Sequence, residues 1–267
     1  MADSVLYEVT DGLATITINR PDAMNAMNTE AKVALRDAVR AAAGDTAVRA
    51  VLLTAAGDRA FCVGQDLKEH IGNLAADRET GSRLTMSTVA EHYNPIVRAL
   101  TEMPKPVVAA VNGVAAGAGF GFALAADFRV VADTASFTTS FVGVALTADS
   151  GVSWTLPRLI GASRASDLLL FPRSVKAQEA YELGIANRLV PAGSLRAEAE
   201  SVARALASGP TVAYAALKES LAYGASHSLA ESLEREDVLQ TRAGASEDHS
   251  IAVQAFLAKQ PPRYLGR

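Results

Sequence analysis

A single carboxylate, Asp149, lies in an otherwise uncharged stretch of the sequence. Between Phe141 and Trp154 no other residue can ionise, and the run VALTADSGVSW is rich in apolar and small residues. An isolated buried charge is costly, so such a group shifts its pKa or finds a partner. Two roles are open for this carboxylate: a general base, or the N-cap of a helix that begins at Ser150 or Gly151.

The loop AFCVGQDL, residues 60–67, can present a backbone donor to a ligand. Gly64 follows a short apolar run, and a turn there leaves the N–H of Gln65 free. Asp66 is placed to cap a helix that begins near Leu67.

The loop NGVAAGAGFGFAL, residues 112–124, offers further donors. Its small residues let a ligand approach the backbone, and the N–H groups of Ala118 and Gly119 would lie at a helix start, where the dipole favours negative charge. Two such loops that converge can hold a developing oxyanion, and one preorganised donor is worth roughly 3–4 kcal/mol. The alternative is that residues 117–121 only permit tight packing of a helix on a strand.

Other chemistries fit the sequence less well. A dinucleotide-binding fingerprint needs a glycine where this chain has Phe122. Ser150 lacks the G-x-S-x-G motif of a hydrolase nucleophile, and the four histidines lack metal-ligand spacing. Cys62 lies between two apolar residues, which is typical of a small buried side chain. We therefore expect no metal site.

The composition excludes several classes of protein. The chain has 267 residues, of which 49% are hydrophobic and 20% charged, with a net charge of −4 and one cysteine. These values allow a large core, exclude an internal disulfide and offer no basic stripe for nucleic acid. The start MADSVLYEVTDG lacks signal-peptide features, and the apolar stretch 106–126 is interrupted by Asn112 and several glycines. We expect a cytoplasmic protein that binds neither nucleic acid nor a membrane.

The elements that must position these loops begin with a hairpin. VLYEVTDGLATITIN contains two alternating runs joined at Asp11-Gly12, a strong hairpin signal. NTEAKVALRDAVRAAAGD predicts a helix that begins at Asn28 or Thr29 and ends at Gly44.

Strands and helices then alternate, which favours an α/β fold with mainly parallel strands. Buried strands are predicted near 50–54, 107–111 and 128–133, and Pro95 interrupts or restarts a helical region that ends near Met103. From about residue 152 helices dominate. The predicted helices are 152–161, 163–170, 176–183, 196–207, 211–222, 229–242 and 251–260.

Six segments resemble the enoyl-CoA hydratase/isomerase, or crotonase, superfamily, in that family's order. They are NRPDAMNAM (19–27), RAFCVGQDLKE (59–69), KPVVAAVNGVAAGAGFGFALAAD (105–127), DSGVSWTLPRLIG (149–161), AQEAYELGIANRLVP (177–191) and the ending AFLAKQPPRYLGR. The resemblance implies an α/β core over 1–200, built as a spiral of ββα units that binds acyl-CoA. It also implies a helical trimerisation region over 201–267, assembly as a homotrimer or dimer of trimers, and a place in fatty-acid metabolism. No cofactor is implied, because coenzyme A belongs to the thioester substrate.

The resemblance also assigns roles to residues. In this family two backbone N–H groups stabilise the enolate of the thioester, and by motif these fall on Gln65 and Ala118. The segment from Ala23 to Ala26 would border the adenine, and Gln65 to Lys68 would line the thioester and pantetheine. The implied substrate and CoA contacts are Ala23, Met24, Ala26, Ala60, Cys62, Gly64, Gln65, Asp66, Leu67, Lys68, Gly117, Ala118, Phe141, Phe256 and Lys259, the last two from the same or a neighbouring subunit.

The chain departs from the family's hydratases at both catalytic glutamates. Those positions are Gly121 and Phe141 here, and neither side chain carries a proton. Water addition needs one group to activate water and another to deliver a proton. Asp149 resembles the single acid of the family's enoyl-CoA isomerases, and its surroundings are similar to those in the epoxyphenylacetyl-CoA isomerase branch.

We therefore expect an isomerase that shifts a double bond. Asp149 would remove the α-proton of a 3-enoyl thioester and return it at the γ-carbon, with a pKa raised by an apolar pocket. Two alternatives stay open. The protein could be a hydratase or another CoA-ester lyase or hydrolase of the same fold, including one that cleaves carbon–halogen bonds, or a non-catalytic acyl-CoA-binding protein.

Overall fold

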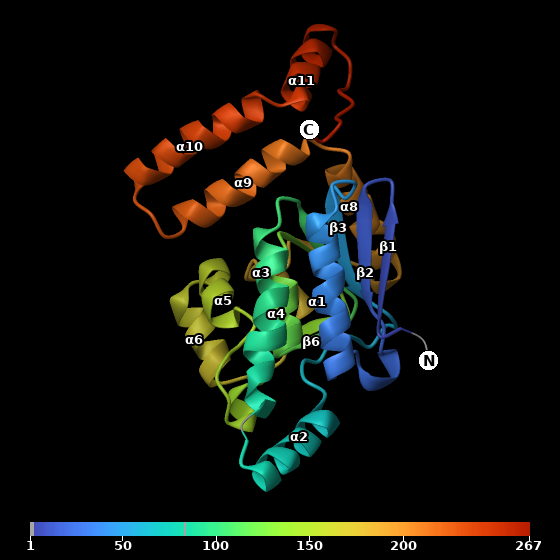
Figure 1. Ribbon diagram of the computed structural model, residues 1–267, viewed down its shortest axis with the longest axis vertical. Coiled ribbons are helices and arrows are strands. Elements are labelled where there is room, and N and C mark those ends of the chain that lie inside the picture. The colour runs from blue at the N-terminus through green and yellow to red at the C-terminus, as the bar shows by residue number, and fades with distance from the viewer. Residues whose placement is uncertain (1–2, 83) are drawn as a thin grey trace.

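Two β-sheets form the core of the chain, for which the computed structural model describes residues 3–82 and 84–267 (Figure 1). The larger sheet has the order β1-β2-β3-β5-β7-β10, and the smaller has the order β4-β6-β8-β9. The strands are β1 Val5–Thr10, β2 Leu13–Ile18, β3 Ala50–Ala55, β4 Ala60–Cys62, β5 Val107–Val111, β6 Val114–Ala116, β7 Phe128–Ala132, β8 Ser136–Thr138, β9 Val175–Lys176 and β10 Arg188–Val190. The β1–β2 and β8–β9 pairs are antiparallel, and the other strand pairs are parallel.

Successive strands alternate between the two sheets. β3 is followed by β4, β5 by β6 and β7 by β8, so each pair contributes one strand to each sheet before helical segments return the chain. This repeated strand–strand–helix unit confirms the predicted spiral α/β architecture.

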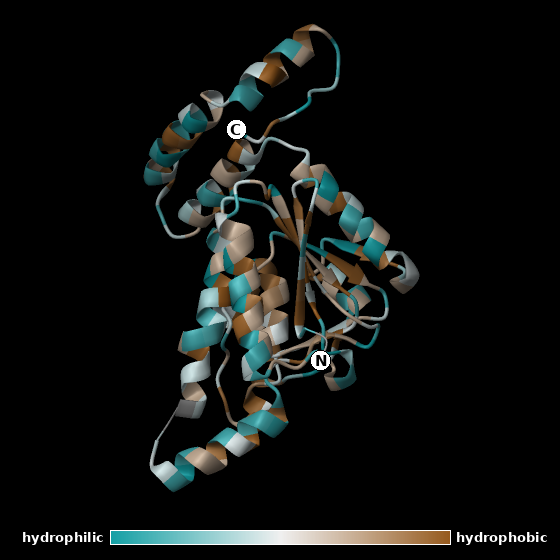
Figure 2. Ribbon diagram, turned by 45° about the vertical axis from the view of Figure 1, so that its right-hand side comes forward, coloured by the Kyte–Doolittle hydropathy of each residue, from teal (hydrophilic) through white to brown (hydrophobic). Residues whose placement is uncertain are grey.

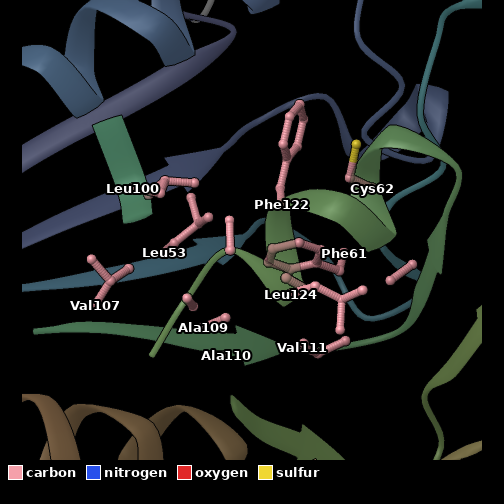
Figure 3. Packing of buried hydrophobic residues seen from close by; sticks show 14 of the residues in the cluster. Leu53, Phe61, Cys62, Leu100, Val107, Ala109, Ala110, Val111, Phe122 and Leu124 are labelled. Carbon is pink, nitrogen blue, oxygen red and sulfur yellow. The ribbon is translucent and has the colours of Figure 1, made fainter. Parts of the chain in front are cut away.

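The central strands are buried along their whole length. β3 (AVLLTA) and β5 (VVAAV) have no exposed residue, as expected for parallel strands that are covered on both faces. Figure 3 shows Leu53, Val107 and Val111 from these strands packed with Phe61 and Phe122. This core fixes the strand ends from which the candidate site is built.

Helices cover both faces of the larger sheet. α1 packs on β1 and β2, and α8 packs on β3, β5 and β7 from the other side (Figure 1). The helices are α1 Thr29–Gly44, α2 Leu67–Thr80, α3 Asn94–Glu102, α4 Ala118–Leu124, α5 Val152–Ile160, α6 Ala162–Leu170, α7 Ala177–Glu182, α8 Leu195–Ala207, α9 Thr211–Gly224, α10 Leu229–Gly244 and α11 Glu247–Leu257. Within the described residues, no helix is both long and apolar enough to cross a membrane.

Capping side chains set several helix ends. Asn28 accepts a hydrogen bond from the N–H of Ala31 at the start of α1, and Asp66 accepts from the N–H of Lys68 at the start of α2. The last helix begins four residues earlier than predicted, because Ser246 caps it, and it ends at Leu257 rather than at residue 260.

The helices α9, α10 and α11 form an arm that projects from one end of the core, while α2 projects from the opposite end (Figure 1). Hydrophobic colour is concentrated on the central strands and is mixed with hydrophilic colour along the arm (Figure 2). Arg49 fastens the arm by donating to the carbonyl of Gly209 at 2.6 Å and to that of Tyr264 at 3.1 Å. The predicted domain boundary at residue 200 falls within α8, which packs on the core sheet.

Candidate active site

The two glycine loops leave adjacent parallel strands. β4 ends at Cys62 and pairs with β6, which ends at Ala116. Parallel strands finish at the same edge of a sheet, so the loops that follow them are neighbours. A Cβ atom placed on Gly64 would lie 3.3 Å from the backbone nitrogen of Ala118. The fold therefore brings the two predicted donor loops together.

The N–H of Gln65 points away from the neighbouring segment that contains Met27. The Gly64 carbonyl accepts from the N–H of Met27 at 2.7 Å, and the N–H of Asp66 donates back to the Met27 carbonyl at 3.1 Å. A trans peptide points its C=O and N–H to opposite sides, and no cis peptide occurs in the described residues. The N–H of Gln65 therefore takes no part in these bonds. Gly64 makes the turn with a φ of 84°, which favours glycine.

The N–H of Ala118 belongs to the first residue of α4. The N–H of Gly121 makes the first helical bond, to the Gly117 carbonyl at 3.1 Å. The amide of Ala118 precedes that bond, at the positive end of the helix. The loop also permits tight packing of α4 against Cys62, because a Cβ on Gly119 would lie 2.0 Å from the Cys62 carbonyl oxygen. Both interpretations of this loop are compatible with the structure.

Asp149 is a half-buried residue with one buried carboxylate oxygen. Its Oδ1 has no hydrogen-bond partner within the described chain. Burial raises the pKa of Asp149, and the Ser150 hydroxyl acts in the opposite direction. Because the Ser150 Oγ has no well-aligned partner in the described chain, burial determines the direction of the pKa shift. The capping alternative is wrong, because the N-cap of α5 is Gly151 and the cap makes no side-chain hydrogen bond. The carboxylate is thus free to act on a ligand.

Position 121, where the hydratases carry their first glutamate, lies against the backbone and side chain of Ser150. A Cβ on Gly121 would lie 2.4 Å from the Cβ of Ser150 and 2.6 Å from its carbonyl oxygen. Real Cβ atoms do not approach neighbours so closely, so this position has no room for a glutamate. The second position, Phe141, is buried, and its ring lies 3.9 Å from where a Cβ on Gly117 would be. An apolar ring therefore replaces the second acid beside the donor loop.

Tyr93 is a site residue that the sequence analysis did not identify. Its hydroxyl donates to Oε1 of Gln65 at 2.7 Å, and its ring packs edge-on against Phe122. Burial is the main cause that raises the pKa of Tyr93, and the nearby charge of Asp149 raises it further. Tyr93 thus holds the Gln65 side chain of the donor loop. It ends a π-helical turn, Val89–Tyr93, a feature frequent at functional sites, but no motif marks this turn in the sequence.

The segment predicted to border the adenine lies beside the first donor loop. It holds the predicted contacts Ala23, Met24 and Ala26. Asn25 donates to the carbonyl of Ala60 at 2.7 Å, and Met27 forms a parallel bridge with Gln65. Its position fits the predicted contacts, which remain predictions.

The start of α2 continues this surface. Asp66 caps the helix and forms an ion pair with Arg20 at 3.0 Å, while Leu67 and Lys68 are exposed on the first turn. Cys62 is fully buried, and burial raises the pKa of its thiol to about 12, so it is not a nucleophile.

Phe256 and Lys259 do not join this cluster within one chain. Both are exposed at the end of α11, on the arm opposite α2 (Figure 1). Their contact with a CoA bound at the donor loops stays a prediction.

Two cavities adjoin the site. The larger, about 1430 Å³, lies between the core and the arm and is lined by residues such as Asn94 and Gly151. The smaller, about 530 Å³, lies beside Gln65. Of the residues predicted from the sequence, Gln65 alone lines either cavity within the described chain.

Comparison with known proteins places the chain in one family. The family model described as enoyl-CoA hydratase/isomerase matches residues 8–267. A Rhodobacter capsulatus protein named as an enoyl-CoA hydratase is 41% identical over 99% of this chain and 98% of its own length. The 1,2-epoxyphenylacetyl-CoA isomerase of Escherichia coli is 37% identical over 100% of both chains.

A solved structure agrees with these relatives. A Mycobacterium abscessus protein assigned to the enoyl-CoA hydratase/isomerases superposes with a TM-score of 0.94 and 48% identity, covering 98% of this chain and 100% of that one. With its paired glycine loops and spiral of ββα units, this chain belongs to the enoyl-CoA hydratase/isomerase, or crotonase, superfamily.

Proposed function

We propose that this enzyme isomerises the double bond of an enoyl-CoA thioester with Asp149 as its only acid–base group. The observation that carries the proposal is a carboxylate whose buried Oδ1 has no partner among the described residues, beside a position 121 that has no room for a second acid. A double-bond shift needs one group that takes and returns a proton, whereas hydration needs two positioned groups.

The reaction proceeds in two proton transfers. The Asp149 carboxylate removes a proton from the α-carbon of a 3-enoyl thioester, and the electron pair moves to the thioester oxygen. The N–H groups of Gln65 and Ala118 donate to that oxygen in the dienolate. The protonated carboxyl then delivers the proton to the γ-carbon, which leaves the double bond between the α- and β-carbons and restores the carboxylate. The reaction needs no further cofactor.

The surroundings match these tasks. Each backbone donor to the oxyanion is worth roughly 3–4 kcal/mol of transition-state stabilisation. Burial raises the pKa of Asp149, which makes its carboxylate a stronger base than an exposed aspartate. Tyr93 holds the side chain of Gln65, the residue whose N–H is one of the two proposed donors.

Assembly is part of the proposal. Leu217 and Leu221 on α9 are exposed at one helical spacing, as are Leu229 and Leu233 on α10. Such apolar surface favours association with other copies of the chain. We propose a trimeric unit in which Phe256 and Lys259 of one subunit approach the CoA of the next.

Product analysis tests the proposed reaction. The purified enzyme is incubated separately with a 3-enoyl-CoA and with the matching 2-enoyl-CoA, and products are separated by chromatography. We expect interconversion of the two enoyl thioesters. Formation of 3-hydroxyacyl-CoA from the 2-enoyl thioester as the main product would identify a hydratase and contradict the proposal.

A further inference from the structure

Residues with polar side chains surround the smaller cavity beside Gln65. Its walls come from α1, α2, Ser82 and residues 85–92, and Ala76 is the one apolar residue among the described residues that line it. Cavities that hold alkyl chains are lined mainly by apolar side chains. An unsubstituted alkyl chain would therefore offer no hydrogen-bond partner to this lining.

The position of the cavity relates it to the acyl group. The Gln65 side chain lines it, while the backbone N–H of the same residue is the proposed oxyanion donor. The proposed function places the thioester at Gln65, so an acyl group that extends from there into this cavity puts its distal end among the residues that line it.

A buried lysine forms part of its wall. The Lys32 side chain is 2% exposed, and its Nζ donates to Oγ1 of Thr88 at 2.9 Å and lies 3.7 Å from a Glu69 oxygen. An ammonium group has three N–H donors, so capacity for a further acceptor remains. The same Thr88 hydroxyl lies 3.3 Å from Nδ1 of His92, which also lines the cavity. A connected polar wall results.

Thr85 supplies a second, independent observation. Its side chain lines the cavity and the residue is 7% exposed, yet its Oγ1 has no hydrogen-bond partner in the part of the chain that the structure describes. A buried hydroxyl without a partner costs free energy. An oxygen atom of a ligand in the cavity would supply the partner that this hydroxyl lacks.

The charges around the wall select the kind of oxygen. Lys32 is balanced by Glu69, and the cavity is also lined by the carboxylates of Asp77 and Glu91. A distal carboxylate would meet this acidic lining and be repelled. We propose that the cavity binds a neutral oxygen function, a hydroxyl or a carbonyl, at the distal end of the acyl group. This inference rests on the proposed function, because that function places the thioester at Gln65.

Equilibrium binding of unreactive thioesters tests the inference separately from catalysis. Calorimetry on the full-length enzyme compares saturated butanoyl-, hexanoyl- and octanoyl-CoA with their omega-hydroxy and omega-carboxy counterparts. We expect one omega-hydroxy thioester to bind about tenfold more tightly than its alkyl counterpart, the effect of one hydrogen bond to a charged group. The omega-carboxy thioesters should gain nothing. Equal affinities of alkyl and omega-hydroxy thioesters at every chain length would overturn the inference.

Two variants locate the preference. Lys32→Met should abolish it, and the isosteric Thr85→Val should reduce it several-fold, while the exposed Lys176→Met, a matched control, should retain it. A preference that survives both cavity variants would also contradict the inference. If the hydroxyl preference is present but no thioester is isomerised, the proposed reaction fails and the cavity assignment stands.

Discussion

The Oδ1 of Asp149 is buried and has no partner among the described residues. This arrangement is unfavourable for stability but useful for a base. The sequence predicted this residue because no other group ionises between positions 141 and 154. It could not predict Tyr93 or Thr85, because their roles depend on contacts across the fold and no local pattern marks them. A side chain could therefore be assigned from the sequence where the sequence itself isolates a charge, and not where its role depends on distant contacts.

The raised pKa of Asp149 predicts a pH-dependent cost in stability. A carboxyl whose pKa rises above its ordinary 3.8 on folding binds its proton more tightly in the folded state. The free energy of unfolding therefore falls as pH rises from that ordinary value through the raised pKa. Asp149→Asn should be more stable than the natural chain at neutral pH, with the difference vanishing at lower pH. Urea unfolding across a pH series measures this, and an Asn variant that is less stable at neutral pH would refute it.

Tyr93→Phe should impair turnover more than folding. The change leaves Oε1 of Gln65 without its buried donor, which costs about 1–3 kcal/mol. We expect kcat to fall about tenfold or more while KM changes little. An unchanged kcat would show that Tyr93 only fills space.

Helices and strands with strong local signals were predicted closely. α1 begins at Thr29 beside its Asn28 cap, and β5 spans the predicted Val107–Val111. The smaller sheet was not predicted, because β4, β6 and β8 have three residues each and show no alternation. Its pairing depends on contacts between distant segments. The donor loops could thus be found in the sequence, but not the sheet edge that joins them.

The close approach of Gly121 in α4 to Ser150 predicts that a larger side chain at position 121 lowers the stability of the fold. Gly121→Ala should destabilise the fold by about 1–3 kcal/mol, because the added Cβ would overlap the backbone and side chain of Ser150. Gly143→Ala is the matched control, since nothing lies within 4 Å of the added Cβ. Urea unfolding compares the two, and equal stabilities would show that position 121 has room for a side chain after all.

At the scale of the whole molecule, the arm exposes apolar surface that a single chain does not cover. Leu221 is 76% exposed on α9, and Phe256 is 82% exposed on α11. The sequence predicted these helices from their periodicity, but their projection from the core depends on tertiary anchors such as Arg49.

Charge on this surface should disrupt assembly without unfolding the core. The natural chain is expected to sediment as a trimer or a multiple of it, and the double variant Leu217→Glu, Leu221→Glu as a smaller species. Both side chains are mostly exposed in one chain, so the core should keep its circular dichroism. Analytical ultracentrifugation decides, and an unchanged mass for the variant would place the interface elsewhere.

The most direct test follows hydrogen at the α-carbon. The natural enzyme and Asp149→Asn are each incubated with a 3-enoyl-CoA in deuterated water, and deuterium incorporation is followed by NMR alongside calorimetric CoA-thioester binding. We predict incorporation and isomerisation with the natural chain, and a loss of roughly 100- to 10 000-fold in the variant with binding retained. Undiminished exchange in the variant, or no exchange with the natural chain, would contradict the assignment of Asp149 as the base.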